Sequence, residues 1–259
     1  MSAVKTCPLD PADLVARFRA AARLAGFCEH AIGEIDGVPL FGYSRRAVGP
    51  KPRIYLSAGV HGDEPAPPEA LLHMVELGVF DDRATWFLMP MLNPAGFRAD
   101  QRENAAGIDL NRDYLRPQSP EVAAHVRWLE RLPRFDLALC LHEDWEATGF
   151  YLYELDDTGR PSFAARLRDA GAAHLPIDPE SIIDGRPIDE PGIIRPESDP
   201  ALRETWPEAI YLREHHTHLC FTTETPTGLA QDQRIATQAA IARRAITETV
   251  NTFHAAHKR

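Results

Sequence analysis

The stretch Ile54-Tyr55-Leu56-Ser57-Ala58-Gly59-Val60-His61-Gly62-Asp63-Glu64 decides the fold of this chain. Its first seven residues form a short apolar run that is typical of a buried strand. A histidine and a glutamate follow, three positions apart, at the strand end where open α/β sheets build their sites. An imidazole nitrogen and a carboxylate oxygen at this spacing can bind one divalent cation, and zinc suits such mixed ligands best. The stretch therefore predicts an α/β sheet with a metal site at its edge.

Further strand-like runs recur along the chain, with helical patterns between them. We expect strands over residues 54–60, 85–92, 135–141, 150–155 and 217–223, and helices over 12–25, 66–77, 120–132, 161–173 and 229–254. This alternation predicts a single α/β domain, residues 1–259, with a mostly parallel or mixed central sheet flanked by helices. Residues 175–208 are rich in proline and acidic residues and lack periodicity, which predicts an irregular insertion that serves as a lid or specificity loop.

Composition and charge narrow the classes of function. With 259 residues, 44% of them hydrophobic, the chain can form a full core without covalent cross-links. A net charge of −10 argues against nucleic acid and anionic membranes as partners. The amino terminus has no apolar signal core, and the cysteines form no CxxC pair, which predicts a reduced, cytoplasmic protein without a membrane span. The cysteines are Cys7, Cys28, Cys140 and Cys220.

Two other strand ends supply groups that a metal-dependent hydrolase needs. His142 follows the strand expected at 135–141, so it emerges at a sheet edge where it could approach His61 and Glu64. Glu224 ends the strand expected at 217–223. A carboxylate that enters a metal site without binding the metal can take a proton from water and return it to a leaving amine. These positions predict metal-assisted hydrolysis.

A loop-like stretch between these blocks carries arginine and asparagine side chains. It comprises Asn93-Pro94-Ala95-Gly96-Phe97 and then residues 102–112, which begin and end with arginine. An arginine fork matches a carboxylate in a bidentate way, and an adjacent amide adds a directional donor. A second arginine beside the metal could hold the oxyanion of a tetrahedral intermediate. Taken alone, the stretch would be read as surface arginines in a polar loop.

Together these blocks resemble the zinc carboxypeptidase family, the M14 metallopeptidases, and within it the short bacterial branch that includes murein-peptide amidases. The matching segments are 61–64, 93–97, 102–112, His142 and Glu224, in the family's order. The resemblance implies a carboxypeptidase-like fold and a metallocarboxypeptidase that hydrolyses an amide bond next to a free carboxylate. It assigns one zinc ion to His61, Glu64 and His142, general base and acid to Glu224, oxyanion stabilisation to Arg102, and the carboxylate clamp to Asn111 and Arg112.

Two features depart from the family's pattern. Glu143-Asp144 follows the second histidine, where the digestive members have small or aromatic residues. The tyrosine that caps the substrate terminus in those enzymes has three candidates here, Tyr151, Tyr153 and Tyr211.

Two alternatives to a carboxypeptidase stay open. One is an N-acyl-amino-acid deacylase of the succinylglutamate desuccinylase or aspartoacylase type, which shares the HxxE…H metal site and a carboxylate base. The substrate would then be an acylated amino acid instead of a small peptide. The other is a metal- or peptide-binding protein without turnover, although a pure binder needs neither a base nor an oxyanion arginine.

Several other residues look like sites but have simpler interpretations. Residues 214–218 hold three histidines that run into a strand, so we expect His216 and His218 to share one face away from the site. His73 lies within a helical pattern and is expected to be packed or on the surface. Asp63 and Asp144 could supply a second metal site, but an orienting role for Asp63 is favoured. Five acids of the insertion could receive a cationic substrate group or form a solvated loop, namely Asp178, Glu180, Asp184, Asp189 and Glu190.

Overall fold

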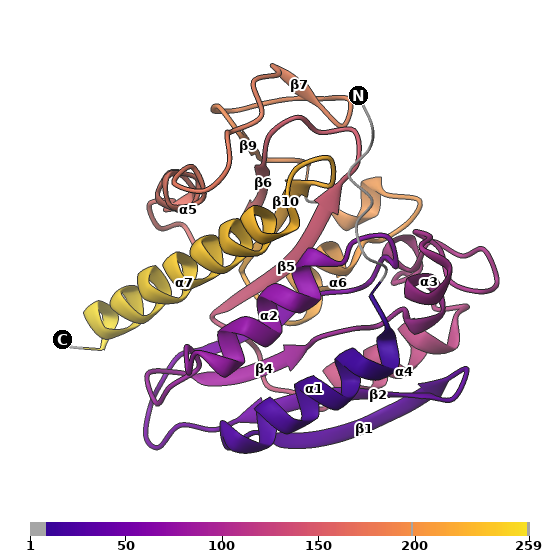
Figure 1. Cartoon of the computed structure of the whole chain (residues 1–259). Coiled ribbons are helices and arrows are strands. Elements are labelled where there is room, and N and C mark those ends of the chain that lie inside the picture. Colours follow the sequence, from indigo (N-terminus) through magenta and orange to yellow (C-terminus); the bar gives the residue numbers. More distant parts are fainter. Residues whose placement is uncertain (1–8, 198, 258–259) are drawn as a thin grey trace.

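The chain builds one eight-stranded sheet in the computed structural model, which describes residues 9–197 and 199–257. Cys7 lies outside these residues. The strands lie in the order β1-β2-β4-β3-β5-β10-β6-β9 (Figure 1). The central four run parallel, whereas β2 and β6 are antiparallel to their inner neighbours. The strand bounds are β1 Cys28–Ile35, β2 Val38–Arg45, β3 Arg53–Ser57, β4 Thr85–Met89, β5 Leu137–Asp144, β6 Tyr151–Asp156, β9 Ile193–Ile194 and β10 Leu219–Pro226.

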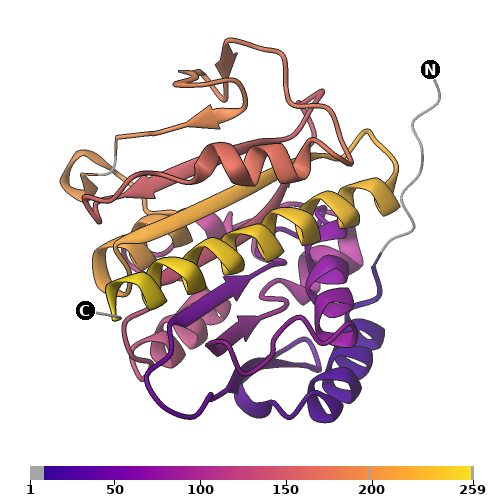
Figure 2. The same cartoon turned by 90° about the vertical axis from the view of Figure 1, so that its left-hand side faces the viewer.

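Helices cover both faces of the sheet (Figures 1 and 2). One face packs against α1 (Pro11–Leu24), α2 (Ala66–Glu76), α5 (Ala164–Gly171) and α7 (Gln231–Ala256). The other face packs against α4 (Pro120–Leu129) and α6 (Glu208–His215). The remaining short elements are α3 (Pro94–Ala99), η1 (Leu110–Arg112), η2 (Pro200–Leu202) and a ribbon of β7 (Ile182–Ile183) and β8 (Arg186–Pro187).

Strand β5 shows why the layers form. Successive side chains of a strand point to opposite faces, so a fully apolar strand supplies two cores at once. Leu137, Leu139 and Leu141 join the core under α2, α5 and α7, whereas Ala138 and Cys140 join the core under α4 and α6. The same alternation continues to the end of β5, where it turns neighbouring polar residues toward opposite faces.

The predicted α/β fold with a mixed sheet is confirmed, and each expected strand and helix is present with slightly shifted ends. The hairpin of β1 and β2 was not predicted. Strand β1 is largely exposed, so its sequence has no apolar run that would indicate a strand. The available signal was Asp36-Gly37, since these two residues, both with positive φ, are typical of a tight hairpin turn. Helix α6 was also missed, because it lies directly after the proline-rich segment and has only eight residues.

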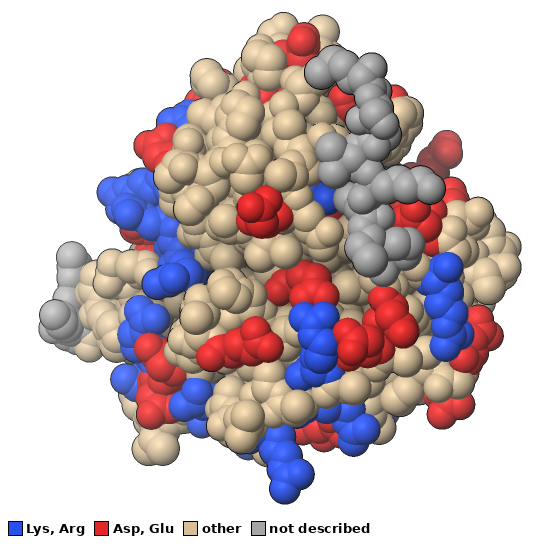
Figure 3. Space-filling view, viewed as in Figure 1, with Lys and Arg blue, Asp and Glu red and all other residues tan. Residues whose placement is uncertain are grey.

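No helix of the described residues is long and apolar enough to cross a membrane. Acidic and basic side chains are interspersed over the face that α1, α2 and α7 form (Figure 3). Such mixing is usual for a surface in contact with water.

Candidate active site

The expected metal ligands lie at the carboxyl ends of β3 and β5. After β3 the chain turns at Gly59, which has a φ of +67°, and then presents His61 and Glu64 ahead of α2. Gly62 lies against the backbone of α3, since a Cβ atom there would come within 2.0 Å of the carbonyl carbon of Gly96. Glycine at 62 therefore lets the ligand loop pack directly on the start of α3.

The three residues bring their ligand atoms together. The Nδ1 atom of His61 lies 2.5 Å from Oε1 of Glu64, and the Nδ1 atom of His142 lies 3.1 Å from Oε2 of Glu64. One ligand atom from each residue falls within 4.8 Å of the others, and all three side chains are buried. Zinc bonds of about 2.1 Å in a tetrahedral site place ligand atoms roughly 3.4 Å apart. The donor set and its spacing therefore fit a zinc ion.

Mutual electrostatics dominate this cluster. Burial alone would raise the pKa of the Glu64 carboxyl, but the charges of His61 and His142 hold that pKa well below its usual range. Burial lowers the pKa of His142, which favours the neutral imidazole that binds metals. The Glu64 carboxylate is therefore ionised at neutral pH, which is the form that can bind a cation.

Asp109 contacts the ring of His61 from behind. Its Oδ1 atom lies 3.2 Å from Nε2 of His61, and its Oδ2 atom accepts a 3.0 Å hydrogen bond from Nε of Arg102. A carboxylate on the second nitrogen fixes the tautomer and orientation of a metal-binding histidine. The sequence interpretation gave this orienting role to Asp63, whose Oδ1 atom is instead buried and has no hydrogen-bond partner among the described residues. The available signal was the position of Asp109 two residues before Asn111 in the 102–112 run.

Glu224 lies beside the cluster on β10. Its register partners are His142 on β5 and Tyr151 on β6, so it shares the sheet edge with the metal ligands. Burial raises the pKa of Glu224 well above its ordinary value, and the nearby charges of Glu64 and Asp144 raise it further. A carboxyl group in this environment holds a proton more readily than one in water, as a group that accepts and returns protons must.

A cavity of about 580 Å³ opens in front of these residues. It is lined by every expected site residue, namely His61, Glu64, Arg102, Asn111, Arg112, His142 and Glu224. Its volume lies in the range of small-molecule sites. Trp145 and Ile182, whose side chains are 72% and 64% exposed, line the same cavity. Large apolar side chains exposed together beside a site commonly contact a ligand.

The cavity also contains arginines without an acidic partner. Arg112 and Arg203 line it, and neither forms an ion pair with any other described residue. Burial lowers the pKa of Arg203, and the nearby charges of Arg186 and Arg112 lower it further. Asn111 accepts a 2.9 Å hydrogen bond from the backbone nitrogen of Glu208, which fixes its amide next to Arg112. Sequence reasoning missed Arg203, because nothing in the irregular insertion indicated which residues would face the site.

The acids of the insertion are mostly engaged elsewhere. The carboxylate of Asp178 accepts backbone hydrogen bonds from Thr148 and Gly149. Asp184 accepts a hydrogen bond from the hydroxyl of Tyr153 and pairs with Arg186. Asp189 and Glu190 both bind Arg195 and do not line the cavity. Glu180 also lines the cavity. It is the one of the five acids whose carboxylate has no hydrogen-bond partner among the described residues.

Two of the three tyrosine candidates face the cavity. Tyr151 donates a 2.8 Å hydrogen bond to Asp144, and Tyr153 donates a 2.9 Å hydrogen bond to Asp184. Both line the cavity, whereas Tyr211 is buried in the core under α6. Tyr211 is therefore not in a position to contact a ligand there.

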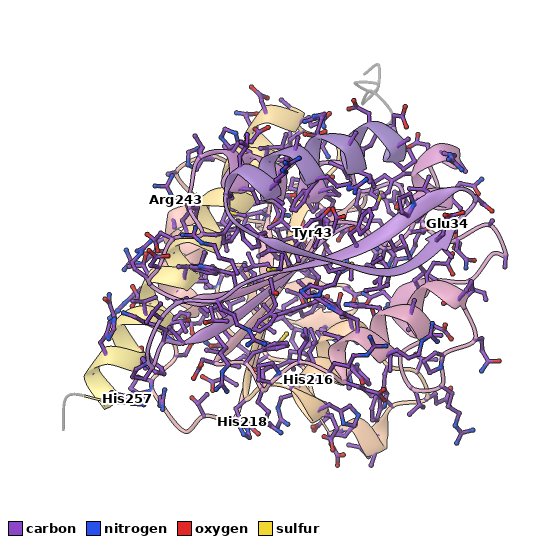
Figure 4. The ribbon with its side chains drawn as sticks, turned by 90° about the horizontal axis from the view of Figure 1, so that it is seen from below. Glu34, Tyr43, His216, His218, Arg243 and His257 are labelled. Carbon is purple, nitrogen blue, oxygen red and sulfur yellow. The ribbon has the colours of Figure 1, made fainter. Side chains whose placement is uncertain are left out.

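The histidines of 214–218 precede β10 and so lie at its opposite end from Glu224, and Figure 4 shows His216 and His218 on that side of the molecule. His216 is buried against Phe135, whereas His218 is exposed and binds Asp157. The expectation that the two share one face is wrong, because α6 extends to His215 and the chain turns before β10 begins. His73 is exposed on α2. Among the described residues, Asp63 and Asp144 join no metal-binding cluster.

Comparison with known proteins identifies the family. A model of the succinylglutamate desuccinylase/aspartoacylase catalytic domain matches residues 50–248, well over half of the chain. The chain belongs to this family. The family carries the name of the alternative enzymes considered from the sequence, and the carboxypeptidases among the relatives confirm the predicted resemblance to the M14 type.

Proteins similar to this chain include carboxypeptidases and a metallopeptidase. Carboxypeptidase SOL1 of Arabidopsis thaliana is 28% identical over 179 residues, which cover 57% of this chain and 34% of that protein. The chain thus spans about a third of the length of this curated relative. A candidate metallopeptidase of Shewanella denitrificans is 26% identical, with a TM-score of 0.79 and coverage of 92% of this chain and 89% of that one. A metallo-carboxypeptidase of Pseudomonas aeruginosa, solved with (2-guanidinoethylmercapto)succinic acid, is 21% identical, with a TM-score of 0.65 and coverage of 92% and 68%.

Proposed function

We propose that this protein is a zinc-dependent hydrolase of the carboxypeptidase type, which cleaves an amide bond next to a free carboxylate. The observation that supports this most is the shared cavity. It joins a His-Glu-His cluster, the half-buried carboxyl group of Glu224 and two arginines without acidic partners among the described residues. A hydrolase for such substrates needs these three elements together: a metal site, a proton-transfer group and an anion-binding group.

His61, Glu64 and His142 would hold the zinc ion. When bound, zinc supplies Lewis-acid polarisation of the scissile carbonyl and acidifies water. Glu224 takes a proton from the attacking water and delivers it to the leaving nitrogen. Arg102 lies within 3.8 Å of Glu64 and donates to the oxyanion that develops at the scissile carbonyl. Asp109 keeps the Arg102 and His61 side chains in place for these roles.

Arg112 and Asn111 would clamp the substrate carboxylate. An arginine and an adjacent amide donor together recognise a carboxylate with direction as well as charge. Arg203 lies close enough to add a second positive charge on the same side of the cavity. The irregular segment 175–208, which contributes Arg203 and the β7–β8 ribbon, is thereby proposed as the specificity segment.

The second candidate function is deacylation of an N-acyl amino acid, and the family match favours it. Both reactions use the same metal, base and carboxylate clamp, and they differ in the acyl group. The 580 Å³ cavity and the exposed apolar side chains of Trp145 and Ile182 provide room and contact for an acyl part larger than acetyl or succinyl. We therefore place the peptidase first.

A matched substrate panel tests the proposal. Purified protein with a measured zinc content is given dipeptides, the same dipeptides with an amidated carboxyl terminus, and N-acetyl and N-succinyl amino acids. We expect hydrolysis of the free-carboxylate dipeptides and a loss of at least tenfold in kcat/KM on amidation. Preference for the N-acyl amino acids would establish the deacylase instead. Zinc binding without any turnover across the panel would return the protein to the class of non-catalytic binders.

A further inference from the structure

Glu143 lies at the edge of the cavity, and its buried carboxylate points toward α7 and makes three contacts. Its Oε2 atom accepts a 2.8 Å hydrogen bond from the backbone nitrogen of Ala66. Its Oε1 atom accepts a 3.3 Å hydrogen bond from the hydroxyl of Thr225 and another from Nη1 of Arg234 on α7. Because β5 alternates, Glu143 faces α7 while its neighbour His142 faces Glu64.

These contacts reach the three segments that carry Glu64, His142 and Glu224. Ala66 comes two residues after Glu64, Thr225 adjoins Glu224, and Glu143 itself adjoins His142. One carboxylate thus ties together the loop before α2, the end of β5 and the end of β10. A shift of any of the three segments relative to the others would break one of these hydrogen bonds.

Gln238 adds a second tie from the same helix. Its Nε2 atom donates a 2.6 Å hydrogen bond to the carbonyl oxygen of His142 and a 3.1 Å hydrogen bond to the hydroxyl of Thr225. Its Oε1 atom accepts a hydrogen bond from the hydroxyl of Thr223. Helix α7 therefore holds the strand ends that carry His142 and Glu224 by two side chains one turn apart.

The burial of this ion pair argues for a role beyond stability. The side chains of Arg234 and Glu143 are both 0% exposed, and within residues 9–197 and 199–257 Nε and Nη2 of Arg234 have no hydrogen-bond partner. Removing two charges from water costs more than such a pair usually returns, and an apolar pair of similar volume is often equally stable. The pair does, however, fix geometry, because each hydrogen bond restricts direction as well as distance.

We propose that Glu143, held by Arg234, is a positioning residue that sets the placement of Glu64, His142 and Glu224 relative to one another. The proposal rests on the proposed function for the role of these three residues. The proposal explains why a glutamate stands at position 143, where the digestive carboxypeptidases have a small or aromatic residue: its carboxylate holds the neighbouring segments in place. Residues that orient metal ligands without touching the metal typically change metal affinity or activity by about 10- to 100-fold.

The test is the paired replacement Glu143→Leu/Arg234→Met, which leaves no buried charge behind. We expect cooperative unfolding near the wild-type temperature, zinc affinity reduced about tenfold or more in chelator competition, and an altered visible spectrum of the cobalt-substituted protein. At saturating zinc we expect kcat to fall about tenfold or more while KM stays within twofold. Wild-type zinc affinity, cobalt spectrum and kcat in a folded double variant would overturn the proposal.

Two further variants keep the test decisive. Thr225→Val is nearly isosteric and removes the hydrogen bond that Thr225 donates to Glu143 and the one that it accepts from Gln238, so it should lower kcat several-fold without changing KM even if the double variant does not fold. An unchanged kcat in Thr225→Val, with no folded double variant, counts against the proposal. The control is Arg166→Met/Glu248→Gln, which removes an ion pair between α5 and α7 and should leave zinc affinity and kcat unchanged. Zinc affinity and the cobalt spectrum are read without substrate, so a failure of the proposed function is distinguished from a failure of this inference.

Discussion

At the carboxyl ends of β5 and β10, the polar side chains on the two faces of the sheet differ in how they are hydrogen-bonded. Toward α7, Glu143, Thr225 and Gln238 satisfy one another in a closed hydrogen-bond network. Toward the cavity, Glu224 forms no side-chain hydrogen bond with a described residue, and Glu64 is bound by two histidines. On the α7 side the carboxylate of Glu143 and the amide of Gln238 both have partners within the protein, whereas on the cavity side the carboxyl group of Glu224 has none among the described residues. Residues on the two sides should therefore respond differently to substitution.

The largest difference should appear for Glu224→Gln. Loss of the proposed base should lower kcat by roughly 10²- to 10⁴-fold with zinc still bound. Because burial and the charges of Glu64 and Asp144 raise the pKa of Glu224, the amide should unfold at an equal or higher denaturant concentration than wild type. Glu146→Gln makes the same chemical replacement at an exposed position of the cavity and should retain activity. Wild-type kcat in Glu224→Gln would show that another group is the base.

A smaller effect should follow from removing the cavity cations. Arg112→Met should raise KM for free-carboxylate substrates about 10- to 100-fold, because a charge-assisted hydrogen bond to an ion contributes about 1.5–3 kcal/mol. Arg203→Met should raise KM by less. Amidated substrates, which lack the carboxylate, should be nearly unaffected by either change. Arg116→Met is a matched control outside the cavity. Equal losses with free and amidated substrates would argue against a carboxylate clamp.

The core below the cavity should show opposing pH effects of two buried groups. Burial lowers the pKa of His125 to about 3, and burial raises the pKa of Glu208 to about 7. The stability linked to neutral His125 is present above its unfolded pKa of about 6.5 and is lost as the pH falls toward 3. The stability linked to protonated Glu208 is present below its unfolded pKa near 4.5 and is lost as the pH rises through 7.

Between pH 7 and pH 5 the two contributions nearly cancel, at roughly 2 kcal/mol each. Denaturant unfolding of Glu208→Gln should therefore show a steeper loss of stability on acidification than wild type. His125→Gln should show the reverse, with greater stability at pH 5 than at pH 7. Both residues belong to one chain of hydrogen bonds through Tyr55. If stability depended on pH in the same way in wild type and in both variants, the shifted pKa values of His125 and Glu208 would be refuted.

The smallest effect should come from the far end of β10. His218→Ala should leave zinc stoichiometry and kcat unchanged, since His218 lies about 20 Å of extended chain from Glu224. Its contact with Asp157 is an exposed ion pair, which contributes about 0–1 kcal/mol. A drop in bound zinc would mean that this histidine cluster is a site after all.

The sequence predicted the central sheet and the residues at its edge because both depend on local patterns. Apolar runs place β3, β5 and β10, and the next residues of each run then emerge at a common edge. The position of Arg203 could not be predicted in this way, since the segment that carries it has no periodicity and is placed by tertiary contacts. The contact of Asp109 with His61 was missed for a related reason, because only the folded loop brings Asp109 to Nε2 of His61.

The long connection from β6 to β10 could change in sequence, and with it the substrate selectivity, without changing the proposed zinc ligands or the base. All of residues 157–218 lie between two strands that are hydrogen-bonded neighbours, and they contain none of the proposed zinc ligands or the base. Its part from 179 to 205 carries Arg186 and Arg203 and ends before the buried Glu208. An exchange of this part between homologues would have to keep the pairing of β9 with β6, and Tyr153 would anchor its tip. Such chimaeras would inherit a reaction from one parent and a substrate range from the other.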